Sequence, residues 1–291
     1  FGHQRVIGGL EIKKESDQTD SRKQRSAFGE YQYRHPNQWN ATAGLRLDDN
    51  DTFGTHTSFR IGTAYLISDD VPGTLKLKGT YGTGFRAPSL FEQGYNNGDF
   101  AFGEAKNLQL KEENSRGFDL GLEWFLKNSF FGLTYFNQQI EDEIIFDAAS
   151  FQGYLQTAGN SRSKGYELEW HHLPVSNIKL WGNYTFNDSE TQSGTPRLRR
   201  PEHLGNLGLS ITDIEQTLSF NANLHWEKGA VDIGNVPLDN FAVFNISMQY
   251  QVNDTLGINA KIDNLFNRDY EQVTGFNSAA RAAYFGMEIN Y

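Results

Sequence analysis

The chain has 291 residues and a formal net charge of −10 at pH 7. This acidic balance argues against a nucleic-acid-binding protein, and the absence of cysteine excludes disulfides and thiolate metal sites. Only 37% of the residues are hydrophobic although 14% are aromatic, a combination that is unusual for a soluble protein. No run of about 18 apolar residues is present, so the sequence predicts no membrane-spanning helix.

Alternation of apolar and polar residues with a period of two is the dominant pattern of the chain, and it indicates β-strands. Every second residue is apolar in the stretches 118–126, 218–226 and 285–291. We therefore predict about 14 strands. In chain order they cover residues 5–14, 26–34, 38–48, 57–67, 74–85, 115–127, 130–145, 162–173, 177–187, 203–212, 216–228, 240–251, 255–265 and 281–291.

The predicted connections between these strands alternate between short and long. The short ones are residues 35–38, 68–73, 127–129, 174–177, 212–215 and 253–254. The long ones are residues 15–25, 49–56, 86–114, 146–161, 188–202, 229–239 and 266–280. Outer-membrane barrels have short periplasmic turns and long extracellular loops. This alternation therefore predicts that the first strand runs outward and that the last strand ends in the periplasm.

Large aromatic residues on the apolar face gather near the two ends of the predicted strands. Those near the short turns are Tyr33, Trp39, Tyr65, Trp124, Trp170, Tyr250 and Tyr291. Those near the long loops are Tyr81, Tyr184 and Trp226. Two aromatic girdles are typical of membrane–water interfaces, so we predict an all-β, antiparallel, up-and-down transmembrane β-barrel. A large soluble β-sandwich or propeller would also alternate, but it does not account for the girdles and the loop asymmetry together.

The longest predicted loop, residues 86–114, carries aromatic and amide side chains that suit the capture of a bulky polar ligand. These candidates are Tyr95, Asn96, Asn97 and Phe100. A loop that packs into the mouth of the barrel would use the same residues, so the sequence leaves both interpretations open.

A second candidate site is the cluster of Arg197, Arg199 and Arg200 at the end of another predicted extracellular loop. These residues could contact an anionic ligand or the phosphates of lipopolysaccharide. We favour ion pairs between the loop and the barrel wall, because the chain has an excess of acidic residues.

A third candidate is an acidic stretch at a predicted long loop. Asp48, Asp49 and Asp51 could supply oxygen ligands to Ca²⁺. A solvated acidic turn is the simpler interpretation, and we expect no resident metal or cofactor.

The sequence offers no catalytic site. Residues 82–87 match the G-x-G-x-x-A dinucleotide fingerprint, but the preceding strand alternates and Pro88 follows where a helix would have to continue. His171 and His172 are adjacent on a predicted strand, so they point to opposite faces and cannot chelate one metal ion. Dispersed carboxylates such as Glu123 suit the lining of a wet interior. We therefore expect that the protein is not an enzyme.

Four segments resemble motifs of the TonB-dependent outer-membrane receptors. They are residues 81–93 (YGTGFRAPSLFEQ), 110–121 (LKEENSRGFDLG), 160–169 (NSRSKGYELE) and 263–270 (DNLFNRDY). The chain also ends on an aromatic residue, Tyr291, where the family more often has Phe. Residues 269–276 followed by Arg281 resemble the vitamin B12 receptor branch in particular.

The resemblance implies a barrel of about 22 strands with an N-terminal plug domain and a segment that engages a TonB-type energy-coupling protein. Residues 1–291 would then be the C-terminal part of that barrel, and the plug and about eight strands would lie outside this chain. The implied location is the bacterial outer membrane, in contact with its lipid and lipopolysaccharide. The implied activity is the import of a bulky, scarce nutrient, either cobalamin or a ferric siderophore. A passive porin or an adhesive surface barrel is the alternative.

Overall fold

The computed structural model describes residues 2–17, 20–36, 38–68, 72–156, 158–212, 215 and 217–290. Its main feature is one antiparallel sheet of 14 strands that follow one another in chain order. The strands are β1 (His3–Ser16), β2 (Ser21–Arg34), β3 (Trp39–Asn50), β4 (Gly54–Ile67), β5 (Thr74–Arg86), β6 (Glu113–Phe125), β7 (Ser129–Glu141), β10 (Asn160–Val175), β11 (Ile178–Glu190), β12 (His203–Thr212), β13 (Leu218–Lys228), β16 (Phe241–Gln251), β17 (Leu256–Asp263) and β20 (Ala282–Ile289).

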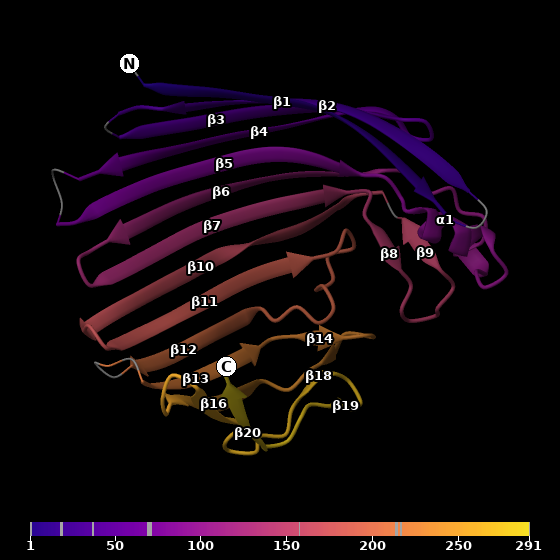
Figure 1. Ribbon diagram of the computed structural model, residues 1–291. Coiled ribbons are helices and arrows are strands. Elements are labelled where there is room, and N and C mark those ends of the chain that lie inside the picture. Colours follow the sequence, from indigo (N-terminus) through magenta and orange to yellow (C-terminus); the bar gives the residue numbers. More distant parts are fainter. Residues whose placement is uncertain are drawn as a thin grey trace.

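The sheet curls into a trough, with β1 at one edge and β20 at the other (Figure 1). These two edge strands do not pair with each other within the described residues. The predicted strands and their up-and-down order are confirmed.

Two of the segments predicted as long loops are mostly strand in the structure, so these two predictions are wrong. The expected loop at residues 15–25 is mostly strand, because β1 and β2 pair as far as Ser16 and Ser21. The expected loop at residues 49–56 is also mostly strand, because β3 and β4 pair as far as Asn50 and Gly54. A tilted strand of about 9–11 residues crosses a bilayer, so these 12- to 14-residue strands extend beyond the membrane.

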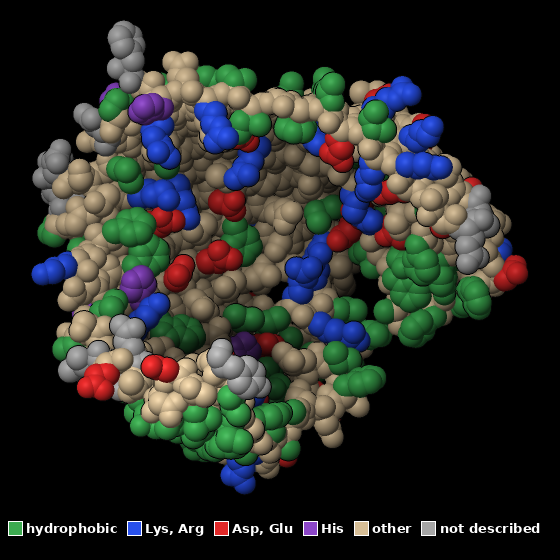
Figure 2. All heavy atoms as spheres, viewed as in Figure 1, with side chains coloured by type: hydrophobic (Ala, Val, Ile, Leu, Met, Phe, Trp, Pro, Cys, Tyr) green, Lys and Arg blue, Asp and Glu red, His purple; other side chains and the backbone are tan. Residues whose placement is uncertain are grey.

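The two faces of the sheet differ in polarity. Leu77, Leu122 and Leu133 lie side by side on β5, β6 and β7, on the convex face. Lys76 and Glu123, which neighbour them along the strands, point to the concave face. Figure 2 shows Lys, Arg, Asp and Glu side chains within the hollow of the trough. An apolar outside and a polar inside are the pattern of a membrane barrel, and they exclude a soluble sandwich with a closed apolar core.

Few apolar side chains are buried among the described residues. They are Ala101, Ala105, Leu110, Ile144, Phe241 and Val243. On the convex face, by contrast, Leu120 is 57% exposed and Ile289 is 56% exposed. These side chains need lipid as their partner.

Aromatic side chains at the short-turn end of the convex face combine an exposed ring with a satisfied polar group. Trp39 is 45% exposed, and its indole nitrogen donates to Thr63 at 2.7 Å. Tyr65 donates from its hydroxyl to Gln38 at 2.9 Å. This arrangement suits a membrane–water interface. Tyr291, also expected in this girdle, lies outside the described residues.

The long connections contain short elements that the alternation does not predict. They are α1 (Leu90–Asn97), η1 (Gly103–Ala105), β8 (Ile144–Phe146), β9 (Tyr154–Gln156), β14 (Val231–Asp232), β15 (Val236–Pro237), β18 (Glu271–Val273) and β19 (Phe276–Asn277). None of the helices in the described part of the chain is long and apolar enough to cross a membrane.

Candidate functional site

The helix α1 and the hairpin β8–β9 lie together at the long-loop end of the sheet (Figure 1). They come from the connections after β5 and after β7. We call α1, η1, β8 and β9 the loop platform. A capping box begins α1: the Ser89 hydroxyl accepts from the Glu92 backbone at 3.1 Å, and the Glu92 carboxylate accepts from the Ser89 backbone at 2.7 Å. This reciprocal pair fixes where the helix starts.

Arg86, the last residue of β5, ties the loop platform to the barrel wall. Its guanidinium donates to Glu113 of β6 at 2.7 and 2.9 Å and to both carboxylate oxygens of Glu92 at 3.0 Å. Glu113 also accepts from the backbone of Ile144 in β8 at 2.6 Å. Forked pairs of this kind fix orientation as well as position. One arginine therefore links β5, β6 and α1, and β8 is linked through Glu113.

The predicted ligand residue Asn96 has a structural role instead. Its side chain is 0% exposed, and its amide both donates to and accepts from the backbone of Tyr154 in β9, at 2.8 and 2.9 Å. Gly153 makes this close approach possible, because an added Cβ there would lie 2.8 Å from the Asn96 oxygen. Asn97, the next residue, is exposed. Of the two amides, only Asn97 is presented to the outside.

Aromatic rings form the outer surface of the loop platform. Tyr95 is half-buried, with ring centroids 6.4 Å from Phe100, 5.7 Å from Phe146 and 5.8 Å from Tyr154. We call the connected rings the aromatic patch: Phe91, Tyr95, Phe100, Phe146, Phe151 and Tyr154. Phe100 is 80% exposed, and Figure 2 shows hydrophobic side chains gathered over this part of the molecule. Exposed apolar patches of this kind mark binding surfaces.

Two of the three predicted arginines are engaged in ion pairs. Arg197 pairs with Glu143, in the connection after β7. Arg199 donates to Asp232 of β14 at 2.7 Å. Arg200 is exposed and has no hydrogen bond or ion pair with any other described residue. Arg197 and Arg199 do form ion pairs, but with other loops rather than with the barrel wall as expected, and Arg200 is left available to an external anion.

Asp232 joins three loops through one carboxylate. It accepts from Arg199 and, at 2.7 Å, from the backbone of Thr274, and it is 2% exposed. Burial alone would raise the pKa of this carboxyl, but hydrogen bonds from Thr274, Arg199 and Ile233 outweigh burial and hold the pKa well below its ordinary value. Asp232 therefore stays charged and keeps the loops together.

The three aspartates of the calcium candidate are not brought together in the structure. Asp48 lies in β3 and accepts from Ser26 at 2.6 Å and from Arg46 at 2.9 Å. Asp49 follows it on the strand and so points to the opposite face, while Asp51 lies beyond the end of β3. Within the described residues no three His, Cys, Asp or Glu side chains are arranged to hold a metal ion. The calcium alternative assumed a loop at this position, but Asp48 and Asp49 lie on a strand.

Polar side chains pair with one another at several places on the concave face. Lys76 and Lys78 on β5 both pair with Glu123 on β6. Further along the sheet, asparagines pair across strands: Asn206 donates to Asn183 at 3.0 Å, and Asn245 donates to Asn223 at 3.2 Å. We call these four residues the asparagine row. These pairs satisfy each other's polar groups, so this part of the wall can face water or a polar solute.

Several residues of the site are absent from the sequence-based candidates. Phe146, Phe151 and Tyr154 belong to the aromatic patch but lie in a different loop from Tyr95. The order of the strands in the sheet could have revealed these residues. In an up-and-down sheet, the loops after β5 and after β7 emerge at the same end, with one hairpin between them.

The family model and the curated proteins that match this chain agree with each other. The family model described as TonB dependent receptor-like, beta-barrel, matches residues 5–265. The vitamin B12 transporter BtuB of Vibrio cholerae is 25% identical over 259 residues, which cover 87% of this chain and 40% of that protein. The iron-regulated outer membrane virulence protein of Vibrio cholerae is 26% identical over 299 residues, covering 93% and 45%. The chain thus spans less than half the length of these curated relatives.

Solved structures agree on the fold. A complex of the ferric enterobactin receptor PfeA superposes with a TM-score of 0.81 at 18% identity, covering 99% of this chain and 52% of that one. The copper transporter OprC gives a TM-score of 0.78 at 17% identity, covering 99% and 54%. The siderophore receptor PirA from Acinetobacter baumannii gives 0.74 at 17% identity, covering 93% and 46%. None of the relatives named above is named as an enzyme.

Proposed function

Because the chain belongs to the TonB-dependent receptor-like β-barrel family of the bacterial outer membrane, we propose that it is part of a receptor that imports a bulky, scarce nutrient. In this proposal the cargo binds from outside, and a TonB-type protein supplies energy from the periplasm. The family match over residues 5–265 carries the proposal. The apolar convex face, which would contact lipid and lipopolysaccharide, and the polar concave face support it.

We also propose that residues 1–291 supply the C-terminal strands of a barrel of about 22 strands whose lumen holds a plug. Two features support this architecture. The sheet has two free edges, which native proteins avoid, and on the edge strand β1 Leu10 is 86% exposed. The curated relatives are also more than twice as long as the segment they share with this chain.

The aromatic patch is the surface that we propose for first contact with the cargo. Cobalamin and ferric siderophores are both large and partly aromatic or apolar, so stacked and edge-on ring contacts suit either. Relatives named for vitamin B12 and for iron regulation are similar to this chain to nearly the same degree, at 25% and 26% identity. Both cargo classes therefore enter the test.

The test uses the full-length receptor. Titration with cyanocobalamin and with a panel of ferric siderophores should show saturable binding of one class. Uptake of that ligand by cells should stop when the proton-motive force is collapsed or the TonB-type protein is deleted. Uptake that rises linearly with concentration and ignores both treatments would indicate a porin. An absence of binding and uptake, with retained adhesion to surfaces, would indicate an adhesive barrel.

A further inference from the structure

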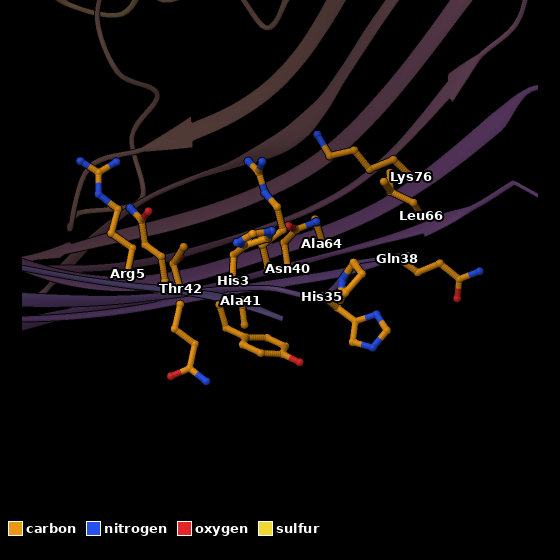
Figure 3. Close-up of a pocket in the computed structure, with 15 residues that line it drawn as sticks. His3, Arg5, His35, Gln38, Asn40, Ala41, Thr42, Ala64, Leu66 and Lys76 are labelled. Atoms are coloured by element: carbon orange, nitrogen blue, oxygen red, sulfur yellow. The ribbon is translucent and has the colours of Figure 1, made fainter. Parts of the chain in front are cut away.

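The short-turn end of the concave face contains a hollow of about 960 Å³ beside the edge strand β1. Five of the residues that line it are basic: His3, Arg5, Arg34, His35 and Lys76. No Asp or Glu is among its described lining residues, although the chain as a whole carries 36 acidic residues against 26 Lys and Arg. We call this feature the cationic hollow (Figure 3).

The register of the sheet explains the shape of the cationic hollow. Arg34 on β2 lies opposite Asn40 on β3, which in turn lies opposite Ala64 on β4. The short side chains of Asn40 and Ala64 form a low floor between longer basic side chains. Arg5 and Lys76 extend to the same side of the strands, at the two ends of this floor (Figure 3).

The guanidinium groups of the two arginines are unpaired within the described residues. The side chains of Arg5 and Arg34 make no hydrogen bond or ion pair with any other described residue. Elsewhere on the concave face, Arg46 pairs with Asp48 and Arg86 with Glu113. Arg60 on the same face stands alone without a described side-chain partner, so the hollow differs in bringing two such arginines together. An arginine that faces a confined interior without a carboxylate is an open binding group, because its planar fork matches an oxyanion.

The two free guanidinium groups can reach one ligand. Arg34 lies opposite His3, and Arg5 is two residues further along β1, so Arg5 and Arg34 are diagonal neighbours on one face. Diagonal neighbours in an antiparallel pair lie about 7–8 Å apart at the backbone, within reach of long side chains. Lys76 adds charge from the far side of the floor, although it shares Glu123 with Lys78.

We propose that the cationic hollow is an anion-binding site for carboxylate or phosphate groups, at the periplasmic mouth of the barrel. The anionic group comes from a free anion in the lumen or from an acidic side chain of the same polypeptide inside the barrel. The placement at the periplasmic mouth rests on the proposed barrel. The site itself is independent of which nutrient is carried.

The experiment compares anion binding by four forms of the full-length receptor at low salt. They are the wild type, the double variant R5Q/R34Q, the charge-preserving variant R5K/R34K and the control R60Q. Arg60 lies on β4, also faces the concave side, and does not line the hollow. Inorganic phosphate is the titrated probe, and the melting temperature of each form is recorded. Strand content by circular dichroism checks assembly, and the single variants R5Q and R34Q serve if the double variant does not assemble.

If the site takes free anions, the wild type binds phosphate saturably and R5Q/R34Q binds it about tenfold more weakly or worse. R5K/R34K binds with intermediate affinity because it keeps the charge but loses the planar fork, and R60Q retains binding. If an internal carboxylate occupies the hollow, the wild type does not bind phosphate, and R5Q/R34Q alone melts at a lower temperature. The proposal is overturned if R5Q/R34Q binds phosphate like the wild type, or if R60Q loses binding equally. The proposal is also overturned if no form binds phosphate and all four forms have the same melting temperature. These readouts do not involve nutrient uptake, so failure here is distinct from failure of the proposed function.

Discussion

Replacing Arg86 with Met should detach the loop platform from the barrel wall without unfolding the barrel. Arg86 donates to Glu113 at 2.7 and 2.9 Å and to Glu92 at 3.0 Å. Methionine has a similar length but no charge and no donor. The substitution therefore leaves two carboxylates facing each other, with side chains only 11% and 12% exposed.

The size of the effect follows from these contacts. Removing one partner of a buried ion pair costs about 3–5 kcal/mol. The Arg86 side chain is 45% exposed, so water already screens part of the interaction, and we expect about 2–3 kcal/mol. This corresponds to roughly 30- to 150-fold more frequent opening of the loop platform.

Hydrogen exchange of the full-length receptor measures this opening. Amides of α1 and of the β8–β9 hairpin should exchange faster in R86M, while those of the barrel strands should not change. The control is R162M, because Arg162 and Glu190 form a pair that is 40% exposed on both sides and worth less than about 1 kcal/mol. In the triple variant R86M/E92Q/E113Q the repulsion is gone, and protection should largely return. Unchanged exchange in R86M, or equal opening in R162M, would refute the reasoning.

Other substitutions test other parts of the structure. N96A removes two buried hydrogen bonds to β9, costs about 2–3 kcal/mol, and should expose the β8–β9 hairpin to proteolysis. The hydrogen bonds that lower the pKa of Asp232 also stabilise the loops that it joins. This stabilisation is fully present above pH 3.8, the ordinary pKa of the carboxyl group, and declines as the pH falls below that value. Hydrogen exchange of the loop amides should therefore depend on pH in this range in the wild type but not in D232N. F100S should leave the melting temperature unchanged and weaken cargo binding by about 3- to 10-fold. G165A should not yield a heat-resistant barrel, because its Cβ would lie 1.8 Å from a backbone oxygen, whereas G29A, with 4.0 Å of clearance, should assemble.

The sequence predicts the barrel strands well wherever lipid imposes alternation. β12 has the predicted bounds, His203–Thr212. The predictions failed where strands continue beyond the membrane into water. Glu15 and Ser16 of β1 and residues 21–25 of β2 are all polar, so they carry no apolar period, yet they belong to regular paired strands. Hydrogen bonding of the backbone, rather than side-chain burial, maintains these extensions.

The candidate site was less predictable because its contacts join distant residues. The Asn96 amide, which suggested ligand binding, has its partner Tyr154 58 positions away. The alternation of apolar and polar residues carries no information about contacts between residues that are so far apart in the sequence. The helix α1 had a local signal, since Ser89 followed by Glu92 is a capping box, but eight residues are too few to show a helical period. For Arg197 and Arg199 the acidic excess of the chain suggested ion pairs, which are formed, but it could not show that the partners lie in other loops rather than in the barrel wall.

The two hydrogen bonds between Asn96 and Tyr154 also bear on the thermodynamics of the cargo capture that we propose. Two loops that would otherwise swing independently are locked together before any ligand arrives, so the rings they carry already hold their relative positions. Ordering a free loop costs about 1–2 kcal/mol for each residue immobilised, whereas adjusting one side chain costs about 0.5–1.5 kcal/mol. In the receptor that we propose, a cargo that lands on Phe100 and its neighbours would therefore meet a preorganised surface, and the receptor would lose little entropy in holding it.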